Sequence, residues 1–492
     1  MRMLKLLSRR QDQHEYLPCN TSPSPVRRAI HATPSRRRTF LCCAFCIPVF
    51  LCFVLYERFS DVQQAWVTVK YASQSKSLPP TYDRYYEIER RYPQHNASLP
   101  FPEGQNGRFL YVSNQHCCIG WNNVFQALIL NTHVAYLSNR AWVFEPYTWD
   151  RHPSPYSTYN GRVIPSRIPL SALIDGPISG GPFPPEHPNP RAASVEFFNQ
   201  VCPENKRTRV SIKEMNKGLG GRPPIEIMEK YASKLLGMAE GCVELYGSME
   251  HPFDWMQFGD SGMETVVPTL SESPILRDFR WSPLVLSAVR INAPNFTPDL
   301  SADPPPDVVR DLMAIHIRRG DYVDHCQHLA NWSASFMGWA QAPGIPDVFV
   351  PPPGGGAGWN TPENTAEYMR HCFPEIADIV RRVTEVKHEW ETRVGRPPKE
   401  PPLKRLYILT NGKAEWVAQL KDRLMRAGDW NIAFSSRDMS LSPEQKYVGQ
   451  AIDMAIAERA AVFLGNGFSS LTSNTVLLRR VHNLPIVSNR FW

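Results

Sequence analysis

The stretch AIHIRRGDYVDHC, residues 314–326, combines apolar residues with groups that could bind an anion. Apolar residues run into His316, and Arg318, Arg319 and Asp321 follow. Two adjacent guanidinium groups at the end of a predicted buried strand are costly to desolvate, and an anionic ligand would offset that cost. A planar guanidinium donates two parallel hydrogen bonds, which suits a diphosphate. Asp321 could orient the arginines or accept hydrogen bonds from a sugar or a base.

Two further segments follow predicted strands and carry ligand-binding chemistry. FLGNGFSSLTSN contains glycines that allow close backbone approach, and it places Ser469 and Ser470 at the start of a predicted helix. The free N–H groups and the dipole of a helix N-terminus favour phosphate. The third segment is GWNN, with Gly120, Asn122 and Asn123, at the first strand-to-helix turn.

Each segment also has an ordinary explanation. Arg-Gly-Asp can be an exposed adhesion tripeptide, paired arginines often form surface salt bridges, and GNGFSS and GWNN can be simple turns. The three segments nevertheless share one position, at strand ends. This shared placement favours a ligand site over any of the separate explanations.

Strands alternate with helices in both halves of the chain, which predicts an α/β fold of two Rossmann-like domains facing a cleft. We expect an acceptor-side domain over residues 104–303 and a nucleotide-sugar domain over 304–492. In such sheets the ligand lies beyond the carboxyl ends of the strands. The expected strands are 109–112, 141–147, 311–318, 405–410, 430–436 and 461–467; the expected helices include 124–140, 224–250, parts of 365–394, 413–428, 442–460 and 469–480, and residues 151–223 are expected to be irregular.

The length and charge of the chain indicate how many domains it has and which partners it is expected to bind. The chain has 492 residues, 42% hydrophobic and 21% charged, which predicts two globular domains with appendages. The net charge is +7, but residues 1–58 hold ten Lys and Arg against three Asp and Glu. The remainder, with 44 of each sign, is neutral. A nucleic-acid partner is therefore not expected.

The basic N-terminus precedes an uncharged apolar run over residues 40–56. As a helix with a rise of about 1.5 Å per residue, this run would be roughly as long as the shortest helices that cross the hydrocarbon core of a membrane. Positive charge before the run predicts a type II signal anchor, with a cytosolic tail over 1–39, a stem over 57–103 and the remainder in the lumen. A cleaved signal peptide is the alternative, but its leading segment would be shorter than this one. We expect the endoplasmic reticulum or Golgi membrane.

Cysteine positions agree with a lumenal location. Six cysteines follow the apolar run, at positions 117, 118, 202, 242, 326 and 372, and they could form up to three disulfides. No Cys-x-x-Cys pair occurs among them, and no Asp-x-Asp occurs in the chain, so no metal site is expected. The sequons at Asn96 and Asn331 could be glycosylated.

HIRRGD after a strand, GNGFSS near the C-terminus and GWNN near the start together resemble the GDP-fucose-dependent fucosyltransferase superfamily. The chain is most similar to protein O-fucosyltransferases and their fungal relatives, over about residues 105–150 and 310–480. The resemblance implies a GT-B fold, GDP-β-L-fucose as donor, transfer with inversion and no metal. It implies a hydroxyl acceptor on a protein or a glycan.

The resemblance also implies roles for individual residues. Arg318 matches the arginine that holds the donor diphosphate, and Asp321 matches an aspartate close by. Asn123 matches an asparagine that contacts the donor, Asp453 an acidic residue that reads guanine, and Ser469-Ser470 a phosphate-binding pair. The chain departs from some members of the family because it has asparagines where they have a glutamate base. The base therefore either lies elsewhere or is not required.

Two other functions remain open from the sequence. The diphosphate chemistry alone also fits a transferase that uses another nucleotide sugar. A non-catalytic lumenal carbohydrate-binding or adhesion protein is the second alternative, and it would not need Arg318.

Overall fold

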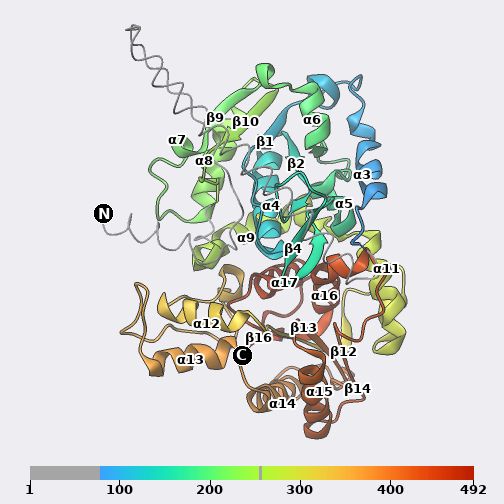
Figure 1. Cartoon of the computed structure of the whole chain (residues 1–492), viewed down its shortest axis with the longest axis vertical. Coiled ribbons are helices and arrows are strands. Elements are labelled where there is room, and N and C mark those ends of the chain that lie inside the picture. The colour runs from blue at the N-terminus through green and yellow to red at the C-terminus, as the bar shows by residue number, and fades with distance from the viewer. Residues whose placement is uncertain (1–77, 254–257) are drawn as a thin grey trace, which may run out of the picture.

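The computed structural model describes residues 78–253 and 258–492 (Figure 1). The predicted cytosolic tail, the apolar run over 40–56 and most of the predicted stem lie outside the described residues. Within the described ranges, no helix combines the length and apolar character that crossing a membrane requires.

The N-terminal half is built on a parallel five-stranded sheet with the strand order β8-β2-β1-β10-β9. Its first strand begins shortly after Gly107, and residues 113–119 connect the strand to GWNN at the start of α4. Residues of α4 and α8 pack on one face, and Phe197 and Phe198 of α6 pack on the other. The bounds are β1 (Phe109–Val112), β2 (Ala141–Phe144), β8 (Ala193–Ser194), β9 (Thr208–Ser211), β10 (Cys242–Tyr246), α4 (Trp121–Leu137), α6 (Val195–Val201) and α8 (Pro224–Leu236).

The C-terminal half contains a second parallel five-stranded sheet, with the order β14-β13-β12-β15-β16. The strand order therefore changes direction between β12 and β15. The bounds are β12 (Val309–Ile317), β13 (Arg405–Thr410), β14 (Ile432–Ser435), β15 (Ala460–Gly465), β16 (Asn489–Phe491), α12 (Tyr322–Asn331), α13 (Pro362–Cys372), α14 (Ile376–Thr392), α15 (Ala414–Ala427), α16 (Gly449–Ala457) and α17 (Ser470–Val481).

Alternate residues of β12 face two different helical layers. Met313, Ile315 and Ile317 pack with residues of α14 and α15. Leu312 and Ala314 belong to the larger core that includes α16 and α17. This alternation fixes the sides to which the residues after the strand point.

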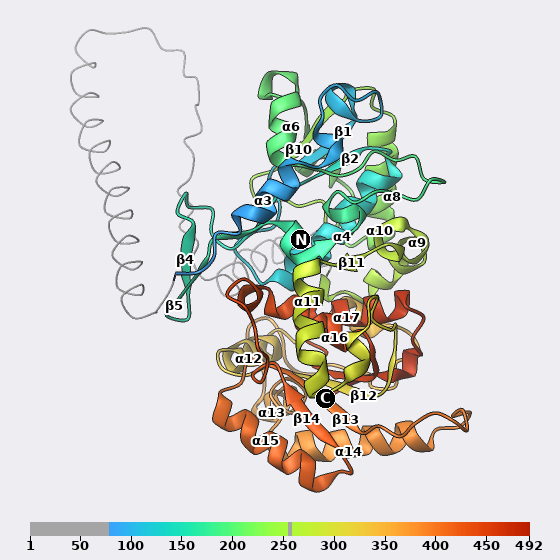
Figure 2. The same cartoon turned by 90° about the vertical axis from the view of Figure 1, so that its right-hand side faces the viewer.

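Smaller elements surround the N-terminal sheet, and α11 among them packs against α16 of the C-terminal half (Figures 1 and 2). β4 and β5 form an antiparallel hairpin, and β3 pairs with β6 and β7 with β11. The bounds are α3 (Asp83–Arg90), β3 (Tyr147–Thr148), β4 (Tyr156–Tyr159), β5 (Arg162–Pro165), β6 (Arg167–Ile168), α5 (Leu170–Leu173), β7 (Ile174–Asp175), α7 (Ile212–Met215), α9 (Val267–Glu272), α10 (Pro274–Arg277), β11 (Arg280–Trp281) and α11 (Pro283–Asn292).

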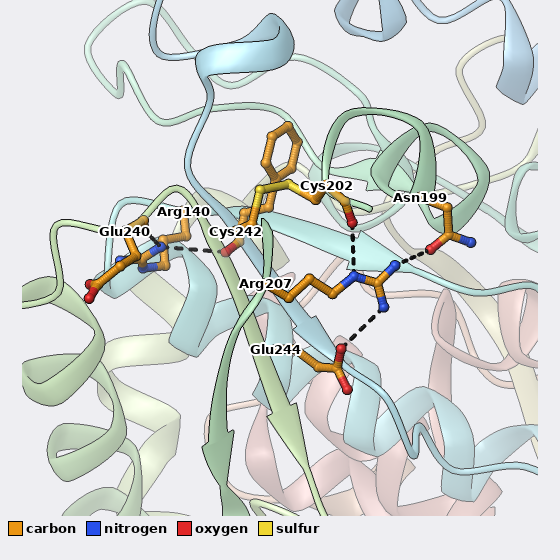
Figure 3. The surroundings of a disulfide bond; sticks show 8 residues. Arg140, Asn199, Cys202, Arg207, Glu240, Cys242 and Glu244 are labelled. Atoms are coloured by element: carbon orange, nitrogen blue, oxygen red, sulfur yellow. Dashed lines mark hydrogen bonds and ion pairs between the residues drawn. A yellow bond between two sulfur atoms is a disulfide. The ribbon is translucent and has the colours of Figure 1, made fainter. Parts of the chain in front are cut away.

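Two disulfides link elements that are adjacent in space. Cys202–Cys242 joins the end of α6 to β10, and Cys326–Cys372 joins α12 to α13. Beside the first, Arg207 donates hydrogen bonds to Glu244, Asn199 and the carbonyl of Cys202 (Figure 3). Cys117 and Cys118 are not disulfide-bonded.

The sequence prediction was wrong for part of the N-terminal half. Residues 224–250 were expected to be one helix, but α8 ends at Leu236 and Cys242–Tyr246 form β10, the strand next to β1. The segment Gly241-CVELY-Gly247 is bounded by glycines and has alternating apolar residues, which is a strand signal. Residues 151–223, expected to be irregular, contain short helices and strands, including the hairpin and β9.

Candidate active site

The ends of β12 and β15 bring HIRRGD and GNGFSS together. The two strands are paired in parallel, so both segments leave the same edge of the sheet. The strand order reverses between these two strands, and a point of reversal is where open parallel sheets bind their ligands. The two segments therefore lie where the sequence predicted a donor site.

Arg318 stands at this edge with its guanidinium stacked on an aromatic ring. Its guanidinium carbon lies 4.7 Å from the centre of the Tyr322 ring. The Tyr322 hydroxyl donates to the carbonyl of Phe468 at 3.2 Å, which joins HIRRGD to GNGFSS. The Arg318 Nε is buried and has no hydrogen-bond partner among the described residues. Such a donor is suited to an anionic ligand.

Arg319 points to the opposite side of the sheet, as the alternation of strand residues predicts. It donates to the carbonyl of Pro374, and its guanidinium carbon lies 4.3 Å from the Phe373 ring centre and 4.2 Å from that of Trp416. The side chain is buried, and burial lowers its pKa to about 10. Arg319 is thus enclosed by structural partners.

His316 lies beneath Arg318 on the same face of β12. Its Nδ1 is 2.9 Å from the Thr472 hydroxyl of α17, and its carbonyl accepts a hydrogen bond from the Trp492 indole. Burial is the main cause that lowers its pKa to about 3, so the ring is neutral at pH 7. The contact with Thr472 gives His316 a role in seating the start of α17 against the strand.

The glycines of GNGFSS are needed for close packing inside the protein. A Cβ on Gly465 would collide with the Thr472 side chain, and a Cβ on Gly467 would meet the Phe336 ring at 2.5 Å. The glycines therefore allow α17 and Phe336 to approach the backbone closely. Asn466 between them donates to the carbonyl of Cys372, the disulfide partner of Cys326 in α12.

Ser469 and Ser470 lie where the sequence predicted, at the start of the twelve-residue helix α17. Ser469 is the N-cap residue, and its side chain makes no capping hydrogen bond. The first N–H groups of an α-helix have no acceptor within the helix. Two hydroxyls and these amides are therefore present at the helix end that lies next to Arg318.

GWNN begins a helix one turn earlier than predicted. α4 starts at Trp121, so both asparagines lie in its first turn. The Asn122 amide donates to Gln450 of α16 at 3.0 Å, and Asn474 of α17 donates to the Asn122 carbonyl at 2.7 Å. Asn122 thus joins the two halves of the molecule, whereas Asn123 has no side-chain partner among the described residues. A Cβ at Gly120 would meet no atom within 4 Å, so the space beside this turn is open.

Asp453 lies on α16 with one carboxylate oxygen bound inside the fold. Its Oδ1 accepts from the Tyr407 hydroxyl at 2.6 Å and from Ser436 at 2.9 Å. Burial raises its pKa to about 6, and the two hydrogen bonds oppose that rise. Its other oxygen can accept hydrogen bonds from a ligand.

Asp321 has a partner that the sequence prediction missed. The Tyr159 hydroxyl donates to its Oδ2 at 2.9 Å. Tyr159 is the last residue of β4, next to a turn in which Asn160 has φ 48° and Gly161 has φ 73°. Asn-Gly between alternating residues is a strong hairpin signal, and it could have revealed this element. Tyr322 and Asn474 left no comparable signal in the sequence.

Residues 264–482 match the family described as GDP-fucose protein O-fucosyltransferase. This range includes Arg318, Asp321, Asp453 and the serine pair. The match lies in the C-terminal half of the chain, where the sequence resembles the GDP-fucose-dependent fucosyltransferase superfamily. The predicted resemblance is therefore confirmed, and the protein is a glycosyltransferase. No curated protein matches the chain by sequence.

Several solved structures of fucosyltransferases are similar to the chain. POFUT1 in complex with GDP has 14% sequence identity and a TM-score of 0.44, covering 79% of this chain and 99% of that one. POFUT1 in complex with GDP-fucose has 13% identity and a TM-score of 0.42, covering 77% and 95%. The fucosyltransferase NodZ from Bradyrhizobium has 11% identity and a TM-score of 0.35, covering 76% and 93%.

Proposed function

We propose that the protein transfers L-fucose from GDP-β-L-fucose to a hydroxyl group of a protein or glycan acceptor, with inversion, in a GT-B arrangement. The observation that carries this proposal is the pairing of β12 with β15, which joins Arg318 and the N-terminus of α17 at one sheet edge. The match of residues 264–482 to the O-fucosyltransferase family supports fucose as the sugar.

In this proposal, Arg318 binds the diphosphate of the donor. Breaking the bond between the sugar and GDP adds negative charge to the leaving group, so a fixed cation stabilises the transition state more than the ground state. The stacking of Arg318 on Tyr322 holds its guanidinium in place before the donor binds. Ser469, Ser470 and the first amides of α17 bind the phosphates from the adjacent side. With this positive field, we propose that no metal is needed.

Asp453 is proposed to select guanine. A carboxylate can accept from both the N1–H and the 2-amino group of guanine, a pair of donors that adenine and uracil lack. Tyr407 and Ser436 hold one of its oxygens, which fixes the orientation of the carboxylate.

Asn123 is proposed to contact the donor, and Asp321 is proposed to lie close to the diphosphate, as the family resemblance implies. The Asn123 side chain remains available for the donor sugar or the acceptor, while Asn122 holds α4 against α16 and α17. His316 is proposed to act by holding the start of α17 against β12 through Thr472. The open space beside Gly120 leaves room for a ligand.

The apolar run over 40–56 and the basic tail are the basis for a further proposal, that the protein is a type II membrane protein of the endoplasmic reticulum or Golgi. Protease added to sealed microsomes should then remove only the N-terminal tail. Protection of the tail with digestion of residues 100–492 would contradict this topology.

A donor screen tests the proposed function. The purified full-length chain is incubated with GDP-fucose, GDP-mannose, UDP-glucose and UDP-galactose, and released nucleotide and melting temperature are measured. GDP-fucose should give both the largest thermal shift and the fastest hydrolysis, and an array of peptides and glycans then identifies the acceptor. A preference for a UDP-sugar would indicate another transferase, and the absence of any donor effect would indicate a binding protein.

A further inference from the structure

The β4–β5 hairpin belongs to the N-terminal half but contacts the donor-binding half. Its strands pair from Tyr156↔Pro165 to Tyr159↔Arg162, and Figure 2 shows the hairpin extending toward α12. A two-stranded hairpin is marginally stable on its own, so contacts elsewhere must hold it. The bond from Tyr159 to Asp321 is such a contact, between residues 162 apart in the sequence.

The Asp321 side chain makes this bond and does not cap the helix α12 that follows it. It stands at the N-cap position of α12, where aspartate commonly accepts from the first amides of the helix. Here its side chain makes no capping hydrogen bond, and its carboxylate accepts from Tyr159. Asp321 thus makes the hydrogen bond to Tyr159 of the other half and not a capping hydrogen bond to α12.

Tyr159 also lies close to Arg318. Burial and Asp321 raise the pKa of its hydroxyl, and the nearby charge of Arg318 opposes that rise. On its other side, the Tyr159 ring packs edge-on against Trp149, with 5.0 Å between ring centres. The hairpin tip is therefore placed next to the arginine proposed to bind the diphosphate.

We propose that Tyr159 is a positioning residue, whose hydrogen bond to Asp321 holds the β4–β5 hairpin beside Arg318 as a wall of the site through which the acceptor approaches. This inference rests on the proposed function. The wall limits the access of water to the donor sugar and leaves the space beside the GWNN turn for the acceptor hydroxyl. Excluding water from the donor suppresses hydrolysis, the reaction that competes with transfer.

Hydrogen exchange of residues 157–164, measured by mass spectrometry, tests the contact. Tyr159→Phe should speed exchange of the hairpin by about fivefold, the effect of losing one ordinary hydrogen bond. Tyr156→Phe makes the same chemical change on the same strand, where the Tyr156 hydroxyl has no hydrogen bond to the other half among the described residues, and it should leave exchange unchanged. Asp321→Asn keeps an accepting oxygen and should largely preserve protection, whereas Asp321→Ala should match Tyr159→Phe, with the double variant no worse than either.

Hydrolysis of GDP-fucose by water tests the role. Tyr159→Phe should raise the hydrolysis rate severalfold while the affinity for GDP stays within about twofold, because the bond holds the wall and not the nucleotide. A general loss of stability would lower both quantities. Unchanged exchange and hydrolysis in Tyr159→Phe would overturn the inference, while failure of the unmutated chain to bind GDP would instead overturn the proposed function.

Discussion

At the residue scale, the two adjacent arginines have separate environments. Arg318 stacks on Tyr322 at the sheet edge, and Arg319 is enclosed by Phe373, Trp416 and the Pro374 carbonyl. Their opposite directions follow from strand alternation, so the sequence sufficed to predict them. The partners of Arg319 come from segments more than 50 residues away, and no local pattern could name them.

This difference predicts different effects for the same substitution. Arg318→Lys keeps the charge but loses the paired donors, so transfer should fall by roughly two orders of magnitude, comparable to the loss of one preorganised donor. The melting temperature of the Arg318→Lys variant without GDP should stay near that of the unmutated chain. Arg319→Lys should lower the unfolding free energy by about 1–3 kcal/mol, because the ring contacts and a buried hydrogen bond are weakened. Near-normal transfer by Arg318→Lys would refute the diphosphate assignment.

The raised pKa of Asp453 predicts that the affinity for GDP depends on pH. The pKa of Asp453 in the ligand-free protein is raised to about 6, and only the ionised form accepts both guanine donors. Affinity for GDP should therefore be highest above pH 6 and should fall as the pH falls through about 6. Because the folded state holds this proton more tightly than the unfolded state, the residue stabilises the ligand-free fold at low pH and loses that contribution as pH rises through 6.

Calorimetric titration of GDP at several pH values measures this effect. Asp453→Asn should weaken GDP binding by about 1–3 kcal/mol and remove the dependence near pH 6, since a mismatched amide replaces the acceptor. Asp422→Asn, an exposed change on α15, is the matched control and should alter neither. A pH profile that persists in Asp453→Asn would assign the titration to another group.

At the element scale, the strands of the C-terminal sheet were predictable because each is a continuous apolar run beside glycine or a helix. β12, β13 and β15 lie close to where the sequence placed them. β16 was missed because its three residues are too short to show a pattern, and β10 was merged with the preceding helix. GWNN contacts α17 through Asn474, whose side chain donates to the Asn122 carbonyl. Asn474 is one polar residue within a helix, so the sequence alone could not predict this contact.

The first turn of α4 separates a structural asparagine from a candidate ligand-binding one. Asn122→Ala removes the side-chain hydrogen bonds to Gln450 of α16 and to Asn474 of α17, and it should lower the unfolding free energy by about 1–3 kcal/mol. Asn123→Ala should leave stability nearly unchanged and lower the transfer rate. Thermal melts and donor turnover of the two variants measure the difference. The opposite pattern would move the donor contact from Asn123 to Asn122.

At the scale of the whole molecule, the two parallel sheets lie in two halves that share one hydrophobic core (Figure 1). Hydrogen bonds of Asn122 on α4 to α16 and α17 add polar contacts between the halves. The sequence predicted two α/β halves from their alternation of strands and helices. It could not predict the disulfide pairing, because six cysteines allow many connectivities. Both disulfides join segments that the sheets bring together.

The Cys326–Cys372 disulfide supports the helix that follows Arg318. Its sequence separation of 46 residues corresponds to about 4 kcal/mol of loop-closure entropy in the unfolded chain. Replacing both cysteines by serine should lower the unfolding free energy by up to about that amount and should also weaken GDP binding, because Cys372 holds Asn466 of the GNGFSS turn. The Cys202–Cys242 pair, in the other half, is the control: its removal should affect stability but not GDP affinity. Equal loss of GDP affinity in both variants would contradict a local effect.

The central claim is that the edge formed by β12 and β15 binds the guanosine diphosphate of the donor. Calorimetric titration of the detergent-solubilised full-length chain with GDP, ADP and UDP, repeated with Arg318→Lys, tests it most directly. We predict that GDP binds at least about tenfold more tightly than ADP or UDP, a difference of about 1.4 kcal/mol, and that Arg318→Lys weakens GDP binding. Equal affinity for the three nucleotides, or unchanged GDP binding by Arg318→Lys, would contradict the claim.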